Sequence, residues 1–132
     1  MEPTVSWWDA GEFIASASKL EVGHPPGAPL FMLIGRVFAS LTGDVTQVAK
    51  MINLVSVLAS AFTILFLFWT IVHFGRKLAG WNKEYSVTEK ILILGSGMIG
   101  ALVFTFSDSF WFSAVEGEVY ALSSFCTAVV FW

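Results

Sequence analysis

Long runs of apolar residues, separated by short polar connections, make up most of the C-terminal part of the chain. The run 50–73 is long enough for a helix that crosses a bilayer, which needs about 20 apolar residues. Two further runs, 91–107 and 115–132, have the same character, and the last still continues where the sequence stops. The pattern predicts three membrane-spanning helices, joined by a polar connection at 74–90 and a polar, aromatic loop at 108–114.

Residues 1–49 follow a different pattern, rich in polar and aromatic residues and interrupted by prolines and glycines. A helix over 6–20 would gather its charged side chains on one side, because steps of three and four residues return to the same face. The apolar run 29–41 is too short to span and contains Arg36, which predicts an interfacial or re-entrant helix. We expect 1–49 to be an outer loop with interfacial helices.

The composition agrees with this division. Of the 132 residues 56% are hydrophobic and only 13% are charged, whereas a soluble domain carries about 25% charged residues. The expected fold class is therefore all-α: one membrane domain, a polytopic helix bundle. The net charge of −3 disfavours nucleic acid and anionic lipid as partners, although the distribution of charge is more informative than its sum. The apolar composition makes the lipid bilayer an expected partner. The single cysteine, Cys126, excludes an intramolecular disulfide.

The lysines and arginines predict the orientation in the membrane. Four of the seven lie in 74–90, so the positive-inside rule places that connection in the cytoplasm. A chain that starts outside needs a preceding span, so we expect a signal-anchor helix before Met1 or a longer parent protein. Eight of the ten carboxylates then share the outer side: Glu2, Asp9, Glu12, Glu21, Asp44, Asp108, Glu116 and Glu118.

Residues 95–100 spell GxGxxG, the fingerprint of a dinucleotide-binding turn. That turn needs a strand before it and a helix opening after it, but here the glycines lie inside an apolar span. Small residues four positions apart allow two membrane helices to approach closely. The motif therefore predicts helix packing and not a nucleotide site.

Asp9 and Glu12 are the first candidates for chemistry. They lie between Trp8 and Phe13 next to the membrane, where desolvation would raise a carboxylate's pKa and suit it to proton transfer. The alternative is a solvated loop. The prolines after His24 fix a turn that would hold this histidine near the pair.

Other candidates come from the remaining outer segments. In one helix Glu116 and Glu118 would point about 200° apart, so we expect Glu118 to face the bundle and Glu116 to be more exposed. A carboxylate inside a bundle is a functional hypothesis. The aromatic residues Trp8 and Trp111 form either an interfacial belt or a platform for a sugar ring, and Arg36 could neutralise a phosphate.

These segments resemble a known group. The chain is similar to the bacterial family called domain of unknown function 2723, grouped with the protein O-mannosyltransferases of glycosyltransferase family 117, and more distantly to membrane glycosyltransferases of GT-C architecture. The likeness covers nearly the whole chain and is carried by three motifs: Trp8-Asp9-Ala10-Gly11-Glu12-Phe13, Gly23-His24-Pro25-Pro26-Gly27 and Trp111-Phe112-Ser113-Ala114-Val115-Glu116-Gly117-Glu118-Val119-Tyr120.

The resemblance implies an enzyme that moves a sugar, with mannose expected, from a polyprenyl-phosphate donor to a Ser or Thr hydroxyl of an acceptor protein. It implies inversion, with Asp9 as general base and Glu12 or His24 on the phosphate side, and with Glu118 positioning the acceptor. It also implies a multi-pass protein of the bacterial inner membrane with its active face toward the periplasm. No ligand spacing indicates a metal, although paired acids could hold a divalent cation.

Two other functions stay open. Acidic residues lining an ion path would fit a segment of an ion-coupled transporter or channel, although such acids lie near the midplane and not at span ends. A purely structural subunit is the other alternative. Enzymes of the resembled class have many more spans than this chain, which we expect to be a fragment that is inactive alone.

Overall fold

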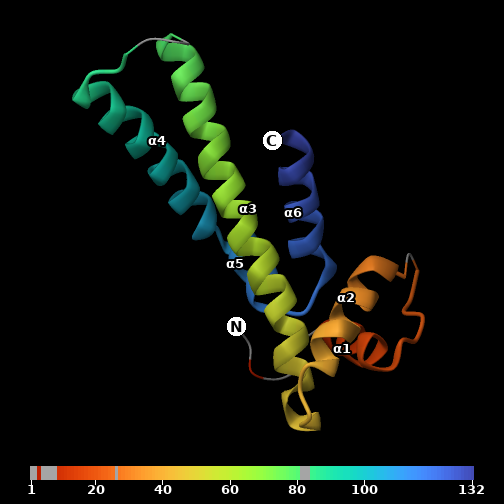
Figure 1. Ribbon diagram of the computed structural model, residues 1–132. Coiled ribbons are helices and arrows are strands. Elements are labelled where there is room, and N and C mark those ends of the chain that lie inside the picture. The colour runs from red at the N-terminus through yellow and green to blue at the C-terminus, as the bar shows by residue number, and fades with distance from the viewer. Residues whose placement is uncertain (1–2, 4–8, 26, 81–83) are drawn as a thin grey trace.

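The computed structural model describes residues 3, 9–25, 27–80 and 84–132, and these residues form helices and turns without a strand. The prediction of an all-α membrane protein is confirmed (Figure 1). The elements follow in this order: α1 Ala10–Lys19, α2 Pro29–Ser40, the short 3-10 helix η1 Val45–Gln47, α3 Val48–Ala79, α4 Val87–Thr105, α5 Asp108–Val115 and α6 Val119–Phe131.

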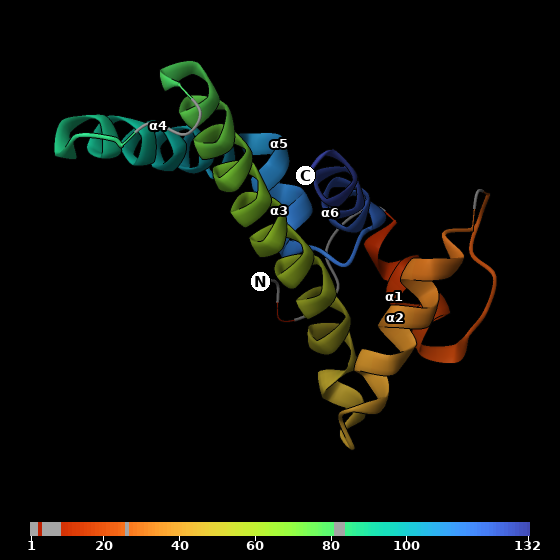
Figure 2. The same cartoon turned by 45° about the horizontal axis from the view of Figure 1, so that its top comes forward.

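Helix α3 is the element against which all the others pack (Figures 1 and 2). Its 32 residues correspond to a length of about 48 Å, more than the roughly 30 Å of a hydrocarbon core. The last turn carries Arg76 and Lys77, whose charges suit a helix C-terminus, and the helix ends at Gly80 with φ 110°. The span predicted at 50–73 is thus lengthened at both ends.

Helix α4 begins at a capping box, which fixes where the connection from α3 ends. The Ser86 side chain accepts from the Glu89 N–H at 3.3 Å, while Glu89 Oε2 accepts from the Ser86 N–H at 2.9 Å. These bonds satisfy N–H groups that have no partner within the helix. Because α3 runs to Ala79 and α4 starts at Val87, the connection predicted at 74–90 shrinks to 80–86.

The glycines of the GxGxxG stretch lie inside α4, and two of them, Gly97 and Gly100, face α3. A Cβ atom on Gly97 would lie 2.7 Å from Val72 Cγ2, and one on Gly100 would lie 2.7 Å from Ile71 Cδ1. Only the missing side chains let the two helices come this close. The prediction that this motif serves helix packing is confirmed.

Helices α5 and α6 replace the expected loop and third span. Residues 108–114, predicted as a loop, are helical within α5, and the two helices meet at a bend of 110°. Helix α6 lies along α3 and runs in the same direction (Figure 1). The described chain therefore has two helices long and apolar enough to cross a membrane, α3 and α4, or three if α5 and α6 together count as one span.

The N-terminal helices pack on the first turns of α3, at the end away from the α3–α4 connection (Figure 2). Helix α2 has 12 residues and is about 18 Å long, too short to cross a bilayer. A small apolar core joins the three helices: Phe13, Ile14, Ala17, Phe31, Met32, Ala39, Ile52 and Val55. This core fixes α1 relative to the spanning helices.

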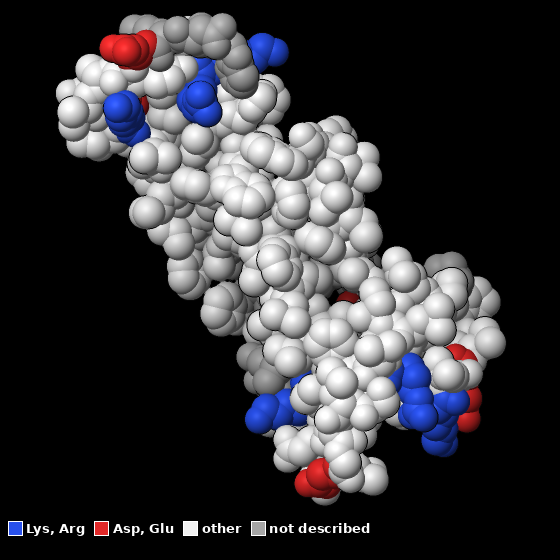
Figure 3. Space-filling model, in the orientation of Figure 1, with Lys and Arg blue, Asp and Glu red and all other residues white. Residues whose placement is uncertain are grey.

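Charged side chains gather at the two ends of the molecule, and the middle of the face drawn in Figure 3 is almost free of them. The sequence agrees, since no Asp, Glu, Lys or Arg occurs between Lys50 and Arg76 or between Lys90 and Asp108. Helices α3 and α4 therefore present an uncharged middle section to the bilayer.

Replacing Gly97 by alanine should destabilise the protein, because the new Cβ would overlap Val72 and the Phe68 ring, which lies 3.1 Å away. Overpacking of this kind costs about 1–3 kcal/mol. Gly95→Ala is the matched control, since a Cβ there meets nothing within 4 Å. Thermal unfolding in detergent should separate the two variants, and equal melting temperatures would contradict the packing role.

Candidate functional site

Asp9 and Glu12 stand at the start of α1 because of how that helix is patterned. Ala10, Phe13 and Ile14 are buried against the core, which leaves the acidic side chains on the outward face. Asp9 is the N-cap residue, but its carboxylate accepts no capping hydrogen bond among the described residues. Both carboxylates, 59% and 42% exposed, therefore remain available to other groups.

The chain returns to Glu12 through a tight helix end. Leu20, with φ 56°, terminates α1, and the Glu21 N–H donates to the Ser16 carbonyl at 2.9 Å, the bonding of a Schellman end. The loop then passes Gly23, where a Cβ would lie 3.3 Å from Glu12 Oε1. The segment thus runs directly over the Glu12 carboxylate.

His24 is held by both oxygens of Glu12. Its backbone N–H donates to Oε1 at 2.7 Å, and its Nδ1 lies 2.9 Å from Oε2. The other ring nitrogen, Nε2, is 3.9 Å from Asp9 Oδ2. The turn after His24 closes through the Gly27 N–H and the His24 carbonyl at 2.9 Å. Asp9, Glu12 and His24 therefore form one cluster.

The cluster changes the proton affinities of two of its members. The hydrogen bonds from the His24 backbone and side chain lower the pKa of Glu12. The side-chain hydrogen bond to Glu12, and then the charge of that carboxylate, raise the pKa of His24. Each change favours the charged form. The pairing therefore favours an ionised glutamate beside an imidazolium.

The second acidic segment lies at the bend between α5 and α6. Glu116 ends α5 and Glu118 precedes α6 in extended backbone, so the assumption of one helix through both residues is wrong. Both residues are partly buried. Partial burial, followed by the charges of Glu116 and Asp9, raises the pKa of Glu118.

This bend is fastened to α3 and α1. The buried Ser56 hydroxyl donates to the Glu118 carbonyl at 3.2 Å. A Cβ on Gly117 would lie 2.7 Å from Asn53 Oδ1 and 3.3 Å from Ile14 Cγ1. Glu118 is therefore brought to the same end of the bundle as Asp9, close enough for the charge of Asp9 to affect it.

The other residues predicted for the site, Arg36, Trp111 and Trp8, either lie away from the acidic cluster or fall outside the described residues. Arg36 donates through Nη1 to the Ser18 carbonyl near the C-terminal end of α1, the opposite end from Asp9. Trp111 lies in α5, half exposed, with its ring stacked on Phe106 at 5.8 Å and 19°. Trp8 lies outside the described residues.

Sequence reasoning missed the residues that support the site, namely Asn53, Ser56 and Gly117. Polar residues three apart in the first spanning helix were one usable signal, because polar side chains in a membrane helix normally face protein. The glycine between two glutamates was another, since glycine permits close approach of backbone to a neighbouring chain.

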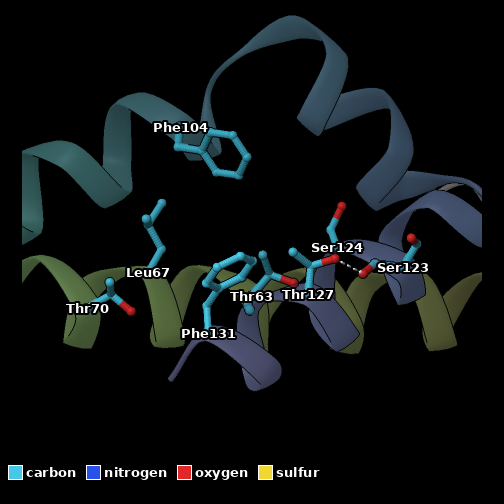
Figure 4. Close-up of a pocket in the computed structure, with 9 residues that line it drawn as sticks. Thr63, Leu67, Thr70, Phe104, Ser123, Ser124, Thr127 and Phe131 are labelled. Carbon is cyan, nitrogen blue, oxygen red and sulfur yellow. Dashed lines mark hydrogen bonds between the residues drawn. The ribbon is translucent and has the colours of Figure 1, made fainter.

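An apolar groove of about 390 Å³ lies between α3, α4 and α6, on the membrane side of Glu118 (Figure 4). Thr63, Thr70 and Thr127 line it, but each hydroxyl donates to a carbonyl of its own helix, at 2.8, 2.8 and 2.9 Å. The groove therefore presents mainly hydrocarbon. In the part of the chain that is described, His, Cys, Asp and Glu form no group of three or more able to hold a metal ion.

Comparison with known proteins places the chain in a family. Residues 9–132 match the family described as the protein O-mannosyl-transferase TMEM260 N-terminal domain. The chain belongs to this family.

Curated relatives carry the same description. The chain is 30% identical over 129 residues to "Protein O-mannosyl-transferase tmem260" of Dictyostelium discoideum, covering 97% of the chain. It is 32% identical over 116 residues to "Protein O-mannosyl-transferase TMEM260" of Mus musculus, covering 88% of the chain. In each case the matched region is 14% of the relative. No solved structure matches significantly.

These matches refine the resemblance seen in the sequence. They support a family of O-mannosyltransferase type. Because the two relatives are eukaryotic, they give no support to the expected bacterial source, inner membrane and periplasmic face. The finding that stands is a membrane protein with apolar spanning helices.

The ion pair between Glu12 and His24 should make stability depend on pH. Because the pKa of His24 is raised, its contribution to folding stability is complete at pH values below its usual pKa of about 6.5. This contribution is lost as the pH rises through the raised pKa. The pKa of Glu12 is lowered, so its contribution to folding stability is complete above its usual pKa of about 4.5 and is lost as the pH falls through the lowered pKa. The melting temperature of Glu12→Gln should therefore fall furthest below wild type between about pH 4.5 and 6.5.

The control for this measurement is Glu21→Gln, which removes an exposed carboxylate that lies 3.9 Å from Lys19 Nζ. Its difference from wild type should stay flat across the same pH range. A flat difference for Glu12→Gln as well would contradict the ion pair.

The anchor at the bend predicts a contrast between two buried serines one turn apart on α3. Ser56→Ala removes the donor to the Glu118 carbonyl and should cost about 1 kcal/mol. Ser60 is 4% exposed, and its hydroxyl has no hydrogen-bond partner among the described residues, so Ser60→Ala should be neutral or stabilising. Denaturant unfolding in detergent measures the free energy of unfolding of both variants. An equal loss of stability in the two would argue against the hydrogen bond from Ser56 to Glu118 as an anchor.

Proposed function

We propose that this chain forms part of the active site of a membrane glycosyltransferase, in which a sugar passes from a polyprenyl-phosphate donor to a protein hydroxyl. The observation that carries the proposal is the convergence of Asp9, the Glu12–His24 pair and Glu118 at one end of the bundle. The names of the relatives support mannose as the sugar and a protein as the acceptor.

The proposed reaction is a single displacement with inversion. The acceptor oxygen bonds to the anomeric carbon, the bond from that carbon to the phosphate oxygen breaks, and the phosphate leaves with the electron pair. Asp9 takes the proton of the acceptor hydroxyl. It suits this role because it is exposed and its carboxylate does not cap α1. General-base catalysis of this kind contributes about 10²–10⁴ in rate.

The other members have supporting roles. Glu12 stays ionised and holds His24, so we assign it to positioning rather than to proton transfer. The imidazolium of His24 supplies positive charge where the leaving phosphate gains negative charge. Glu118, partly buried with a raised pKa, would hydrogen-bond the acceptor or the sugar.

The groove beside α6 supports a donor that remains in the bilayer. It lies between α3, α4 and α6 and is lined mainly by hydrocarbon, and its threonine hydroxyls are bonded within their own helices. A polyprenyl tail is apolar and would fit such a surface. Its sugar phosphate would then reach the end of the bundle where the carboxylates lie. On this proposal the active face is the side of the membrane opposite the basic 74–90 segment.

The test uses the complete protein and measures transfer of labelled mannose from polyprenyl-phosphate mannose to a Ser/Thr peptide. Asp9→Asn should lower kcat by about 10²-fold or more. Asp44→Asn is the matched control, because asparagine can replace the carboxylate that caps η1 through the Thr46 N–H. Full turnover by Asp9→Asn would remove Asp9 from the role of base.

A further inference from the structure

The end of the molecule opposite the acidic cluster contains a hollow of about 280 Å³ between α3 and α4. Its wall includes a cation from each helix, Arg76 and Lys90, and the ring of Tyr85. Its floor is formed by Val72, Ile93 and Leu94. The hollow therefore combines positive charge with an apolar base.

The order of these residues along the two helices is the same. Arg76 follows Val72 by one turn toward the end of α3, and Lys90 precedes Leu94 by one turn at the start of α4. In both helices the cation lies outermost and the apolar residue lies toward the middle of the span. A membrane lipid has the same order, with its phosphate at the interface and its acyl chains deeper.

Close contacts hold together the parts of α3, α4 and their connection that surround the hollow. A Cβ on Gly75 would lie 3.3 Å from Ile93 Cγ2, so α3 and α4 nearly touch at this level. Tyr85 Oη lies 2.9 Å from the Gly80 carbonyl and 3.1 Å from the Arg76 carbonyl, as donor to either one. The connection is thereby tied to the end of α3, and the two cations belong to one fixed unit.

The charge pattern indicates the kind of ligand. The predicted orientation turns this end toward the cytoplasmic leaflet, where anionic phospholipids are concentrated and attract nearby Lys and Arg residues. Basic hollows between spanning helices on that side are suited to phosphate headgroups. Figure 3 shows Lys and Arg side chains at this end, with Asp or Glu side chains beside them; in the sequence 74–90, four cations accompany Glu84 and Glu89.

We propose that the hollow formed by Arg76, Tyr85 and Lys90 binds the phosphate of an anionic membrane lipid, whose acyl chain lies against Val72, Ile93 and Leu94. The site is independent of the sugar-transfer site at the other end of the bundle. Failure of one proposal therefore leaves the other untouched.

The experiment measures retention of phosphatidylserine by the complete protein in detergent, by native mass spectrometry, with phosphatidylcholine as the neutral lipid. Phosphatidylserine should bind more tightly, and Arg76→Gln and Lys90→Gln should each weaken it about fivefold. Lys77→Gln is the matched control, since Lys77 adjoins Arg76 but does not line the hollow. Its effect should be less than twofold.

Two results would overturn the proposal. Equal losses in Lys77→Gln and Arg76→Gln would show diffuse attraction to a charged surface without a site. Equal retention of both lipids would show that the net negative charge of the headgroup is not recognised, since both lipids contain a phosphate. An inorganic phosphate arm distinguishes the source: displacement of the lipid by millimolar phosphate would point to a soluble anion, whereas unchanged retention supports the lipid.

Discussion

The contact that the rest of the site depends on is the close approach of the Gly117 backbone to α3 and α1. With Asn53 on one side and Ile14 on the other, there is no room for a side chain at this position. The Ser56 hydrogen bond to Glu118 contributes about 1 kcal/mol, whereas overpacking costs about 1–3 kcal/mol. A side chain at position 117 would therefore cost at least as much as loss of the Ser56 hydrogen bond.

Much of the fold follows from local patterns in the sequence. The apolar runs predicted α3 and α4, and the small residues in α4 predicted its packing against α3. The ends of the helices were less well predicted. Arg76 and Lys77 are good helix formers, and they extend α3 beyond the apolar run from which it was predicted. The Ser86 and Glu89 spacing of a capping box was visible and marks the start of α4.

The site was predictable only in part, for a physical reason. His24 follows Glu12 by 12 residues, and the proline turn between short helices restricts where it can lie. Ser56 and Glu118 are 62 residues apart, and no local pattern links them. The chain from Glu116 to Glu118 is extended and packs against α3, so the prediction of one helix through both residues was wrong.

The placement of charge also bears on the competing interpretation as an ion path. Such a path needs ionisable groups near the middle of the bilayer. The long helices α3 and α4 contain no Asp, Glu, Lys or Arg between residues 51 and 75 or between 91 and 105. The acidic groups of the candidate site lie near helix ends and not in these middle sections.

The two oxygens of Glu12 have different partners, and this separates the shape of the site from its charge. One oxygen accepts from the His24 backbone N–H, which does not titrate, and the other faces the imidazole, which does. Loss of the imidazolium proton therefore leaves the backbone at His24 tied to α1. The cluster can lose a positive charge while its backbone stays in place, so the same loop geometry serves both protonation states of the histidine.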